Sequence, residues 1–169
     1  MYPAELLRED AGPADGMVVL RAVEATVEVV ASEPVTGHVL VFGADIAKGP
    51  WHDHRAFLRA VRDQGGATVL AHPYRYEDGA ERLAELLRVD AVEVASVNVR
   101  PEQAELARSL ARRLGLPMVA GSDAHQAKHV GRYATRFVRG VATSAEVAEE
   151  IRAGSVAPVE GHGIAGLWE

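Results

Sequence analysis

The stretch ATVLAHPYRYEDGAERLAELLRVDAVEVA (residues 67–95) decides the fold. It begins with a short apolar run (67–71) of the length of a buried strand and ends with a second one (91–95). Between them, the leucines of residues 79–88 recur at helical spacing. Strands that alternate with helices in this way build a parallel sheet from βα units. The stretch therefore predicts an α/β protein.

The same alternation continues on both sides of this stretch. The predicted strands are 17–31 (with a bend or a hairpin inside), 37–43, 67–71, 91–95 and 117–121. The predicted helices are 4–10, 54–64, 79–88, 101–115 and 143–154, the last opening at a capping box of Thr143 and Glu146. The tail 159–169 is expected to have little structure of its own. We expect the 169 residues to form one domain.

The composition narrows the classes of function. A net charge of −6 argues against a nucleic-acid or membrane-surface binder, because both favour basic patches. The chain has no cysteine, so disulfides, thiolate metal sites and cysteine nucleophiles are excluded. It has no stretch of about 18 apolar residues and no apolar leader at its N-terminus. The expectation is therefore a cytoplasmic protein in which a metal could only be held by histidine and carboxylate.

Polar side chains follow two of the predicted strands at the edge where parallel βα proteins collect their reactive groups. His72 ends one strand, and Asp123 and His125 follow another. In an extended segment Asp123 and His125 point the same way, and Gly121 permits an unusual backbone angle beside them. Imidazole and carboxylate together suit zinc, manganese or iron. The alternatives are a core histidine at His72 and a helix cap at Asp123.

These motifs carry a resemblance to a known family. AHPYR (71–75), EVASVN (93–98) and GSDAH (121–125), in this order and spacing, resemble the later motifs of the PHP (polymerase and histidinol phosphatase) family. GHVLVFG (37–43) is similar to the family's fourth-strand motif, and AVEAT (22–26) to the strand before it. The resemblance covers residues 17–158.

The resemblance implies a distorted seven-stranded β/α barrel, similar to a TIM barrel, with one to three divalent ions at the carboxyl end of its strands. It implies that Glu24 (with Glu28 as the alternative), His38 and His72 share one ion. Asp123 would join Glu24 at a second ion and His125 would serve a third, and these two residues would be catalytic. A metal-bound hydroxide would then cleave a small phosphorylated substrate, which Arg75 and Lys128 would hold.

The sequence departs from the family pattern at its start. The HxH and TDH-like motifs of the first two βα units do not precede Glu24, so we expect an incomplete barrel of about five mostly parallel strands. His52 and His54 form an HxH in another place, where Asp53 reads as a helix N-cap. Exposed sheet edges would favour a second copy or a partner chain that completes the barrel.

Three functions follow from these expectations. The first is a metal-dependent phosphoesterase whose activity an N-terminal truncation would impair. The second is a non-catalytic PHP-like module that binds metal or a partner. The third is a metal-dependent hydrolase of C–N bonds, which uses similar ligands in a similar barrel, although the order of the motifs favours the PHP family.

Overall fold

The computed structural model describes residues 11–14, 17–29, 34–47, 49, 51–75 and 79–160. Its strands are β1 (Ala11–Ala14), β2 (Met17–Val19), β3 (Val23–Val29), β4 (Val35–Phe42), β5 (Ala67–Leu70), β6 (Ala91–Ala95), β7 (Met118–Ala120), β8 (Tyr133–Phe137) and β9 (Val156–Glu160). Its α-helices are α1 (His54–Arg62), α2 (Ala80–Leu87), α3 (Pro101–Leu114) and α4 (Ser144–Arg152). A 3₁₀ turn, η2, spans Ala127–His129.

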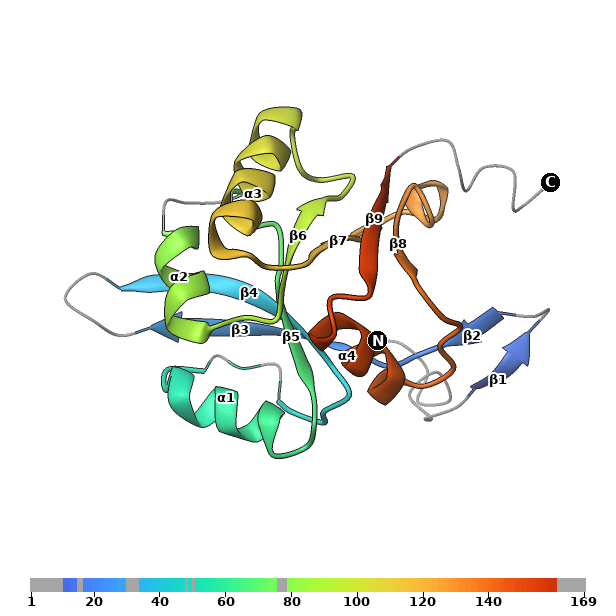
Figure 1. Ribbon diagram of the computed structural model, residues 1–169, viewed down its shortest axis with the longest axis horizontal. Coiled ribbons are helices and arrows are strands. Elements are labelled where there is room, and N and C mark those ends of the chain that lie inside the picture. Colours follow the sequence, from blue (N-terminus) through green and yellow to red (C-terminus); the bar gives the residue numbers. More distant parts are fainter. Residues whose placement is uncertain are drawn as a thin grey trace.

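A five-stranded sheet in the order β3-β4-β5-β6-β7 forms the centre of the molecule (Figure 1). β4 is antiparallel to both β3 and β5, whereas β5, β6 and β7 are parallel to one another. Four of the five strands therefore run in one direction and β4 runs against them. β1–β2 and β8–β9 form two further antiparallel pairs outside this sheet.

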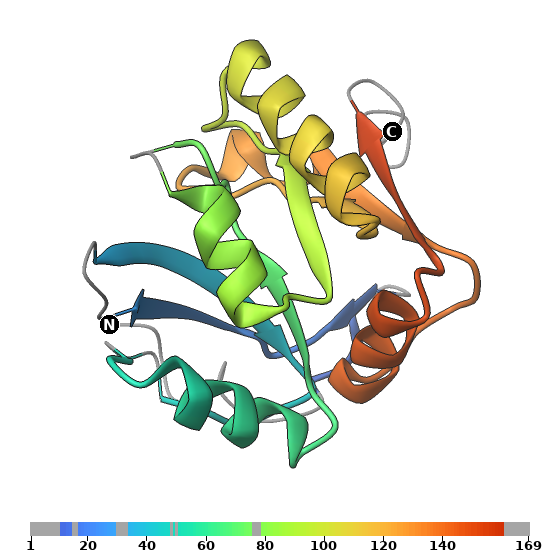
Figure 2. The ribbon, with the colours of Figure 1, turned by 60° about the vertical axis from the view of Figure 1, so that its left-hand side comes forward.

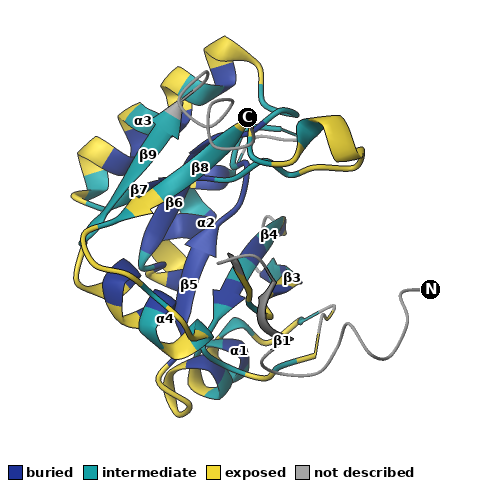
Figure 3. Cartoon of the chain, turned by 90° about the vertical axis from the view of Figure 1, so that its right-hand side faces the viewer, coloured by how far each residue is buried: buried dark blue, intermediate teal, exposed yellow. Residues whose placement is uncertain are grey.

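Helices cover both faces of the central sheet. α1, α2 and α3 pack on one face, as Figure 2 shows, because their apolar residues meet the outward side chains of β3, β4 and β6. α4 packs on the other face, against Ala67, Val69 and Val119. Layers on both sides explain why every residue of β5 and β6 is buried (Figure 3).

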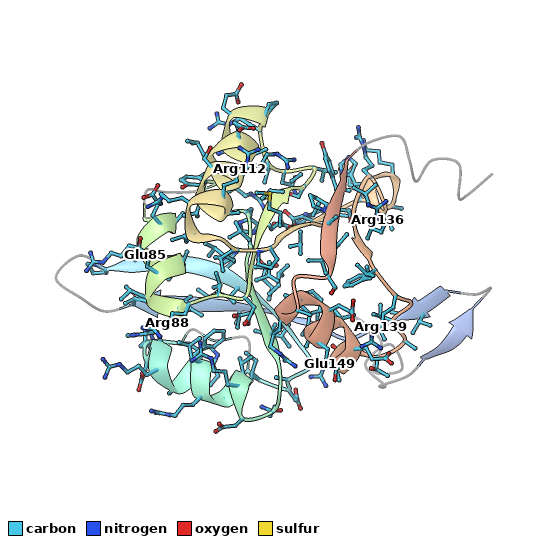
Figure 4. All side chains as sticks on the ribbon, in the orientation of Figure 1. Glu85, Arg88, Arg112, Arg136, Arg139 and Glu149 are labelled. Carbon is cyan, nitrogen blue, oxygen red and sulfur yellow. The ribbon has the colours of Figure 1, made fainter. Side chains whose placement is uncertain are left out.

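The β8–β9 pair and α4 close the second face of the sheet. Oγ1 of Thr135 donates to the carbonyl of Ala120 at 2.8 Å and accepts from its N–H at 2.9 Å, so a side chain of β8 satisfies the backbone at the end of β7. Arg139 follows β8 and reaches back to α4, where it pairs with Glu149 at 2.9 Å (Figure 4) and with Glu150 at 2.6 Å. The contacts of Thr135 thus hold β8 against the central sheet, and those of Arg139 hold the segment after β8 against α4.

The predicted α/β class, the five mostly parallel strands and the helices between them are confirmed. The first strand region is interrupted at residues 20–22, as the expected bend requires, and Thr143 and Glu146 form the expected capping box of α4. The predicted helix at 4–10 lies outside the described residues. Among the described strands, β3 and β7 do not pair with each other, so the central sheet is open.

Three strands, β1, β8 and β9, were not predicted. β9 extends to Glu160, so the residues at 159 and 160 are strand and not tail. Pro158 is compatible with a strand here because, within the described part of the chain, β9 pairs on one side only, with β8. No helix in the described residues has the length and apolar character that crossing a membrane requires.

Candidate metal centre

Glu24, His38 and His72 converge at one point of the second face of the sheet. Oε1 of Glu24 lies 2.8 Å from Nδ1 of His38 and 3.4 Å from Nε2 of His72. The two imidazole rings meet edge to face, with 5.2 Å between their centroids. One ligand atom from each residue lies within 4.8 Å of the others, and among the described residues this is the one group of three or more potential ligands with that property.

The strand register explains why these residues meet. Glu24 lies opposite Leu40 and Thr26 lies opposite His38, so Glu24 and His38 extend from the same face of the β3–β4 pair. The N–H of Ala71 donates to the carbonyl of His38 at 3.0 Å, which places the end of β5 level with His38. His72 comes next in the chain and is buried. Three strands of the sheet thus each supply one of the three side chains.

His72 has a backbone φ of 28°, in the left-handed region that residues with a side chain seldom adopt. Asp123, at the end of β7, has a φ of 45°. Such backbone strain typically costs about 1–3 kcal/mol and is concentrated at functional sites, where the surrounding structure holds it in place. Among the described residues other than glycine, the third with a positive φ is Arg88, the C-cap of α2. The other two, His72 and Asp123, were both predicted from the sequence as ligands.

The electrostatics of the three residues suit a cation. The hydrogen bond with His72 lowers the pKa of Glu24, against the raising effect of its partial burial, and the positive charge that His38 can carry lowers the pKa further. Glu24 is therefore anionic at neutral pH. Donors at 2.0–2.1 Å from a tetrahedral ion lie roughly 3.3 Å apart, close to the 2.8 and 3.4 Å seen here. The residues fit a divalent metal ion that imidazole and carboxylate would hold.

Asp123 and His125 form a second group, at the ends of β6 and β7. Oδ2 of Asp123 accepts hydrogen bonds from Nη1 of Arg75 and Nδ2 of Asn98, both at 2.7 Å. Nδ1 of His125 lies 3.0 Å from the carbonyl of Asp123 and 3.8 Å from its Oδ1, and the His125 side chain is exposed. The positive φ of Asp123 means that the segment is not extended, contrary to the expectation from the sequence.

Glu93 on β6 lies between the two groups and was not predicted from the sequence. Its Oε2 accepts a hydrogen bond from the backbone N–H of His72 at 2.9 Å. Burial raises the pKa of Glu93 to about 7, because its contact with His72 only partly offsets the loss of water, and the charges of Asp123 and Glu24 raise it as well. The signal in the sequence was a glutamate inside the apolar run AVEVA.

Gly121 lies next to Glu93, and its role differs from the one expected. It is not among the glycines with a positive φ. A side chain would instead meet Glu93, since a Cβ at this position would lie 3.2 Å from Oε1 of Glu93. Gly121 therefore leaves room for the buried carboxyl group.

The turn that carries His72 and Arg75 is anchored from α3. The N–H of Arg75 donates to the carbonyl of His72 at 3.0 Å, which closes the turn. Nε2 of the buried Gln103 donates to the carbonyl of Tyr74 at 2.6 Å, and its Oε1 accepts from the N–H of Arg100 at 2.9 Å. Gln103 was also missed in the sequence, where its position on an otherwise amphipathic helix gave no signal.

The remaining predicted residues lie elsewhere. Nδ1 of His52 pairs with Oε2 of Glu28 at 2.6 Å, so His52 is not in the Glu24–His38–His72 group. Asp53 is the N-cap of α1, as expected, with Oδ1 accepting from the N–H of Arg55 at 2.9 Å. His54 is the first residue of that helix. Lys128 is exposed on the 3₁₀ turn η2.

A cavity of about 200 Å³ lies beside Glu93, on the face of the sheet that carries Glu24 and His38. Its walls are mostly apolar and come from β4, β5, β7, β8 and α4: Leu40, Phe42, Val69, Val119, Ala120, Gly121, Thr135, Phe137, Val147 and Ile151. The cavity places apolar surface next to the polar groups, an arrangement typical of small-molecule sites.

Comparison with known proteins supports the assignment that the motifs suggested. Residues 101–156 match the model of a family described as PHP-associated. The predicted resemblance to PHP proteins is confirmed. The PHP-associated segment runs from the start of α3 to the start of β9 and contains Gln103, Asp123 and His125. Glu24, His38 and His72 precede it. No curated protein sequence matches the chain.

One of three similar solved structures shares the fold at low identity, and the other two superpose less well. PsfC of Pseudomonas syringae is 20% identical and superposes with a TM-score of 0.60 over 84% of this chain and 59% of its own. The chain thus spans about three fifths of that protein. An amidohydrolase of Chromobacterium violaceum (24% identity, TM-score 0.46) matches over 70% of this chain and 42% of its own. A candidate metal-dependent phosphoesterase of Bifidobacterium adolescentis is 16% identical, with a TM-score of 0.48, and matches over 80% of this chain and 77% of its own.

Proposed function

We propose that this chain is a metal-dependent phosphoesterase that holds a divalent ion, zinc, manganese or iron, at Glu24, His38 and His72. The observation that carries the proposal is the convergence of these three side chains, from three strands, to within 4.8 Å. The PHP-associated segment and a distantly similar structure named as a phosphoesterase agree with this reading. The proposed substrate is a small molecule with a phosphate ester.

The residues around the proposed ion would have different roles in the hydrolysis of the phosphate ester. When bound, the ion supplies positive charge for the phosphoryl oxygens and makes water a stronger acid. Glu24 and the two imidazoles hold the ion. Glu93 fixes the backbone of His72 and thereby the direction of its ring. Arg75, held by Asp123, presents a guanidinium that matches the geometry of phosphate oxygens.

The apolar cavity beside Glu93 would receive the carbon part of the substrate. Lys128, on the exposed turn after His125, is a second cation that would attract the phosphate to the site. A second copy of the chain or a partner chain that completes the barrel also stays a prediction, and the molar mass in solution tests for the second copy.

Turnover of a generic phosphate monoester tests the proposal. Purified protein loaded with Mn²⁺ or Zn²⁺ should release phosphate, and removal of the ion with a chelator should abolish the release. His38→Ala should abolish it too, whereas Arg55→Ala, an exposed arginine on α1, should leave it unchanged. Stoichiometric metal without turnover would identify a non-catalytic metal-binding module. Turnover of amide substrates instead would identify a hydrolase of C–N bonds.

A further inference from the structure

The carboxylate of Asp123 already has a cationic partner in this protein. Oδ2 receives two donors at 2.7 Å, one from Arg75 and one from Asn98. A second hydrogen bond from Nδ2 of Asn98 reaches the backbone carbonyl of Asp123 at 2.8 Å. The side chains of both Asp123 and Arg75 are mostly buried, with exposed fractions of 17% and 23%. A charge pair as sheltered as this one is held more firmly than an exposed pair.

The backbone fixes Arg75 beside the metal centre. Arg75 and His72 close one turn through the hydrogen bond between their backbones, and Gln103 anchors the middle of that turn at Tyr74. The guanidinium therefore lies on a rigid support three residues from a proposed metal ligand. Because the anchor belongs to α3, Arg75 does not need a metal ion to hold it in place, and Arg75 and Asn98 in turn hold the carboxylate of Asp123.

A second ion on Asp123 would meet two obstacles. It would have to displace Arg75 and Asn98 from Oδ2, and it would then lie close to a permanent positive charge. It would also lack ligands, because in the described part of the chain the one converging group of three potential ligands is Glu24, His38 and His72. Asp123 and His125 alone offer two.

We propose that the chain binds a single divalent ion, at Glu24, His38 and His72, and that the guanidinium of Arg75 supplies the second positive charge of the site. Asp123 is then a positioning residue that orients Arg75 toward an anionic oxygen of the substrate. This role differs from the second-ion role that the family resemblance implies. The inference rests on the proposed function, since it concerns the same site.

The first test counts metal ions. Equilibrium dialysis against Mn²⁺ should give one equivalent for the wild-type chain and for Asp123→Asn, with affinities within about threefold of each other. Two or three equivalents in the wild type, with one fewer in Asp123→Asn, would overturn the inference. So would one equivalent that Asp123→Asn binds tenfold or more weakly, about 1.4 kcal/mol.

The second test measures the binding of inorganic phosphate to the Mn²⁺-loaded protein by calorimetry. Arg75→Ala should weaken phosphate binding by about tenfold or more. Added guanidinium ion should restore part of the loss in Arg75→Ala and less in the Arg75→Ala/Asp123→Asn double variant, because Asp123 holds the guanidinium. Phosphate binding by Arg75→Ala at the wild-type affinity, or equal rescue of both variants, would contradict the role of the pair.

Arg75→Lys replaces Arg75→Ala as the test variant if Arg75→Ala does not fold. The lysine keeps the positive charge and lacks the planar guanidinium with its paired donors. It should keep one equivalent of metal and bind phosphate more weakly, and wild-type phosphate affinity would count against the inference. The outcomes also separate the inference from the proposed function. Two equivalents with phosphate-ester turnover would contradict the single-ion inference alone. One equivalent without turnover of any phosphate ester would contradict the function alone.

Discussion

Glu93 and His72 are joined through the backbone: Oε2 of the buried glutamate accepts the N–H of His72 at 2.9 Å. His72 needs this support because its φ of 28° is strained and because it lies just beyond the end of β5, outside the ladder of the sheet. The glutamate itself is unfavourably placed for a charge, since it lies within the apolar layer between β6 and α4. The candidate metal centre therefore depends on a carboxyl group whose ionisation is costly.

This cost predicts a pH dependence of stability in the metal-free protein. The pKa of Glu93 is about 7 when folded, against 4.5 as its ordinary value, so the folded state holds a proton that the unfolded state releases between these values. Raising the pH through this window favours unfolding. The destabilising effect of ionising Glu93 is absent below pH 4.5, develops as the pH rises to about 7, and reaches on the order of 3 kcal/mol.

Glu93→Gln keeps an oxygen that can accept the N–H of His72 and cannot ionise. We expect its free energy of unfolding, from urea titrations in EDTA, to fall less than that of the wild type between pH 5 and pH 8. Glu102→Gln, an exposed site on α3, should show the wild-type difference. Equal falls in Glu93→Gln and the wild type would show that Glu93 does not carry the effect.

Gln103 should be important for both stability and metal binding. Gln103→Ala leaves the carbonyl of Tyr74 and the N–H of Arg100 without their partner, which should cost about 1–3 kcal/mol in urea unfolding. The freed turn should also weaken Mn²⁺ binding, because it carries His72. A loss of stability with unchanged metal affinity would show that the turn does not need this anchor. Ser109→Ala, at an exposed position of the same helix, is the control.

Thr135 should hold the end of β7 through its hydroxyl group. Thr135→Val keeps the shape of the side chain and removes both hydrogen bonds to Ala120, whose backbone is buried, so we expect a loss of about 1–3 kcal/mol in thermal or urea unfolding. Thr135→Ser keeps the hydroxyl and should recover most of the loss. Equal stability of the Val and Ser variants would rule out the hydroxyl as the cause.

Much of the fold could be predicted because local patterns and tertiary packing agree. The leucines of α2, the Pro101 start of α3 and the capping box of α4 each mark an element that the structure contains. β8 could not be found in this way. Its residues YATRF are half-buried, and its partner β9 is more than 15 residues away, beyond α4. Pairing at such a distance leaves little trace in a local pattern.

Part of the candidate site could also be predicted from the sequence, and part could not. His72 and Asp123 could be found because strand ends carry the reactive groups of α/β proteins. The partnership of Asp123 with Arg75 could not, because it joins residues 48 positions apart through a turn whose left-handed φ at His72 no sequence rule predicts. Glu93 was visible only as a charge within an apolar strand, and its bond to His72 depends on the parallel pairing of β5 with β6.

The affinity of the chain for Mn²⁺ or Zn²⁺, measured by calorimetry in the wild type and in His72→Ala, tests the metal centre most directly. His52→Ala is the matched control, because His52 pairs with Glu28 outside the centre. We predict stoichiometric binding by the wild type and His52→Ala, and binding at least about 100-fold weaker in His72→Ala. Absence of binding by the wild type, or wild-type affinity in His72→Ala, would contradict a metal site at Glu24, His38 and His72.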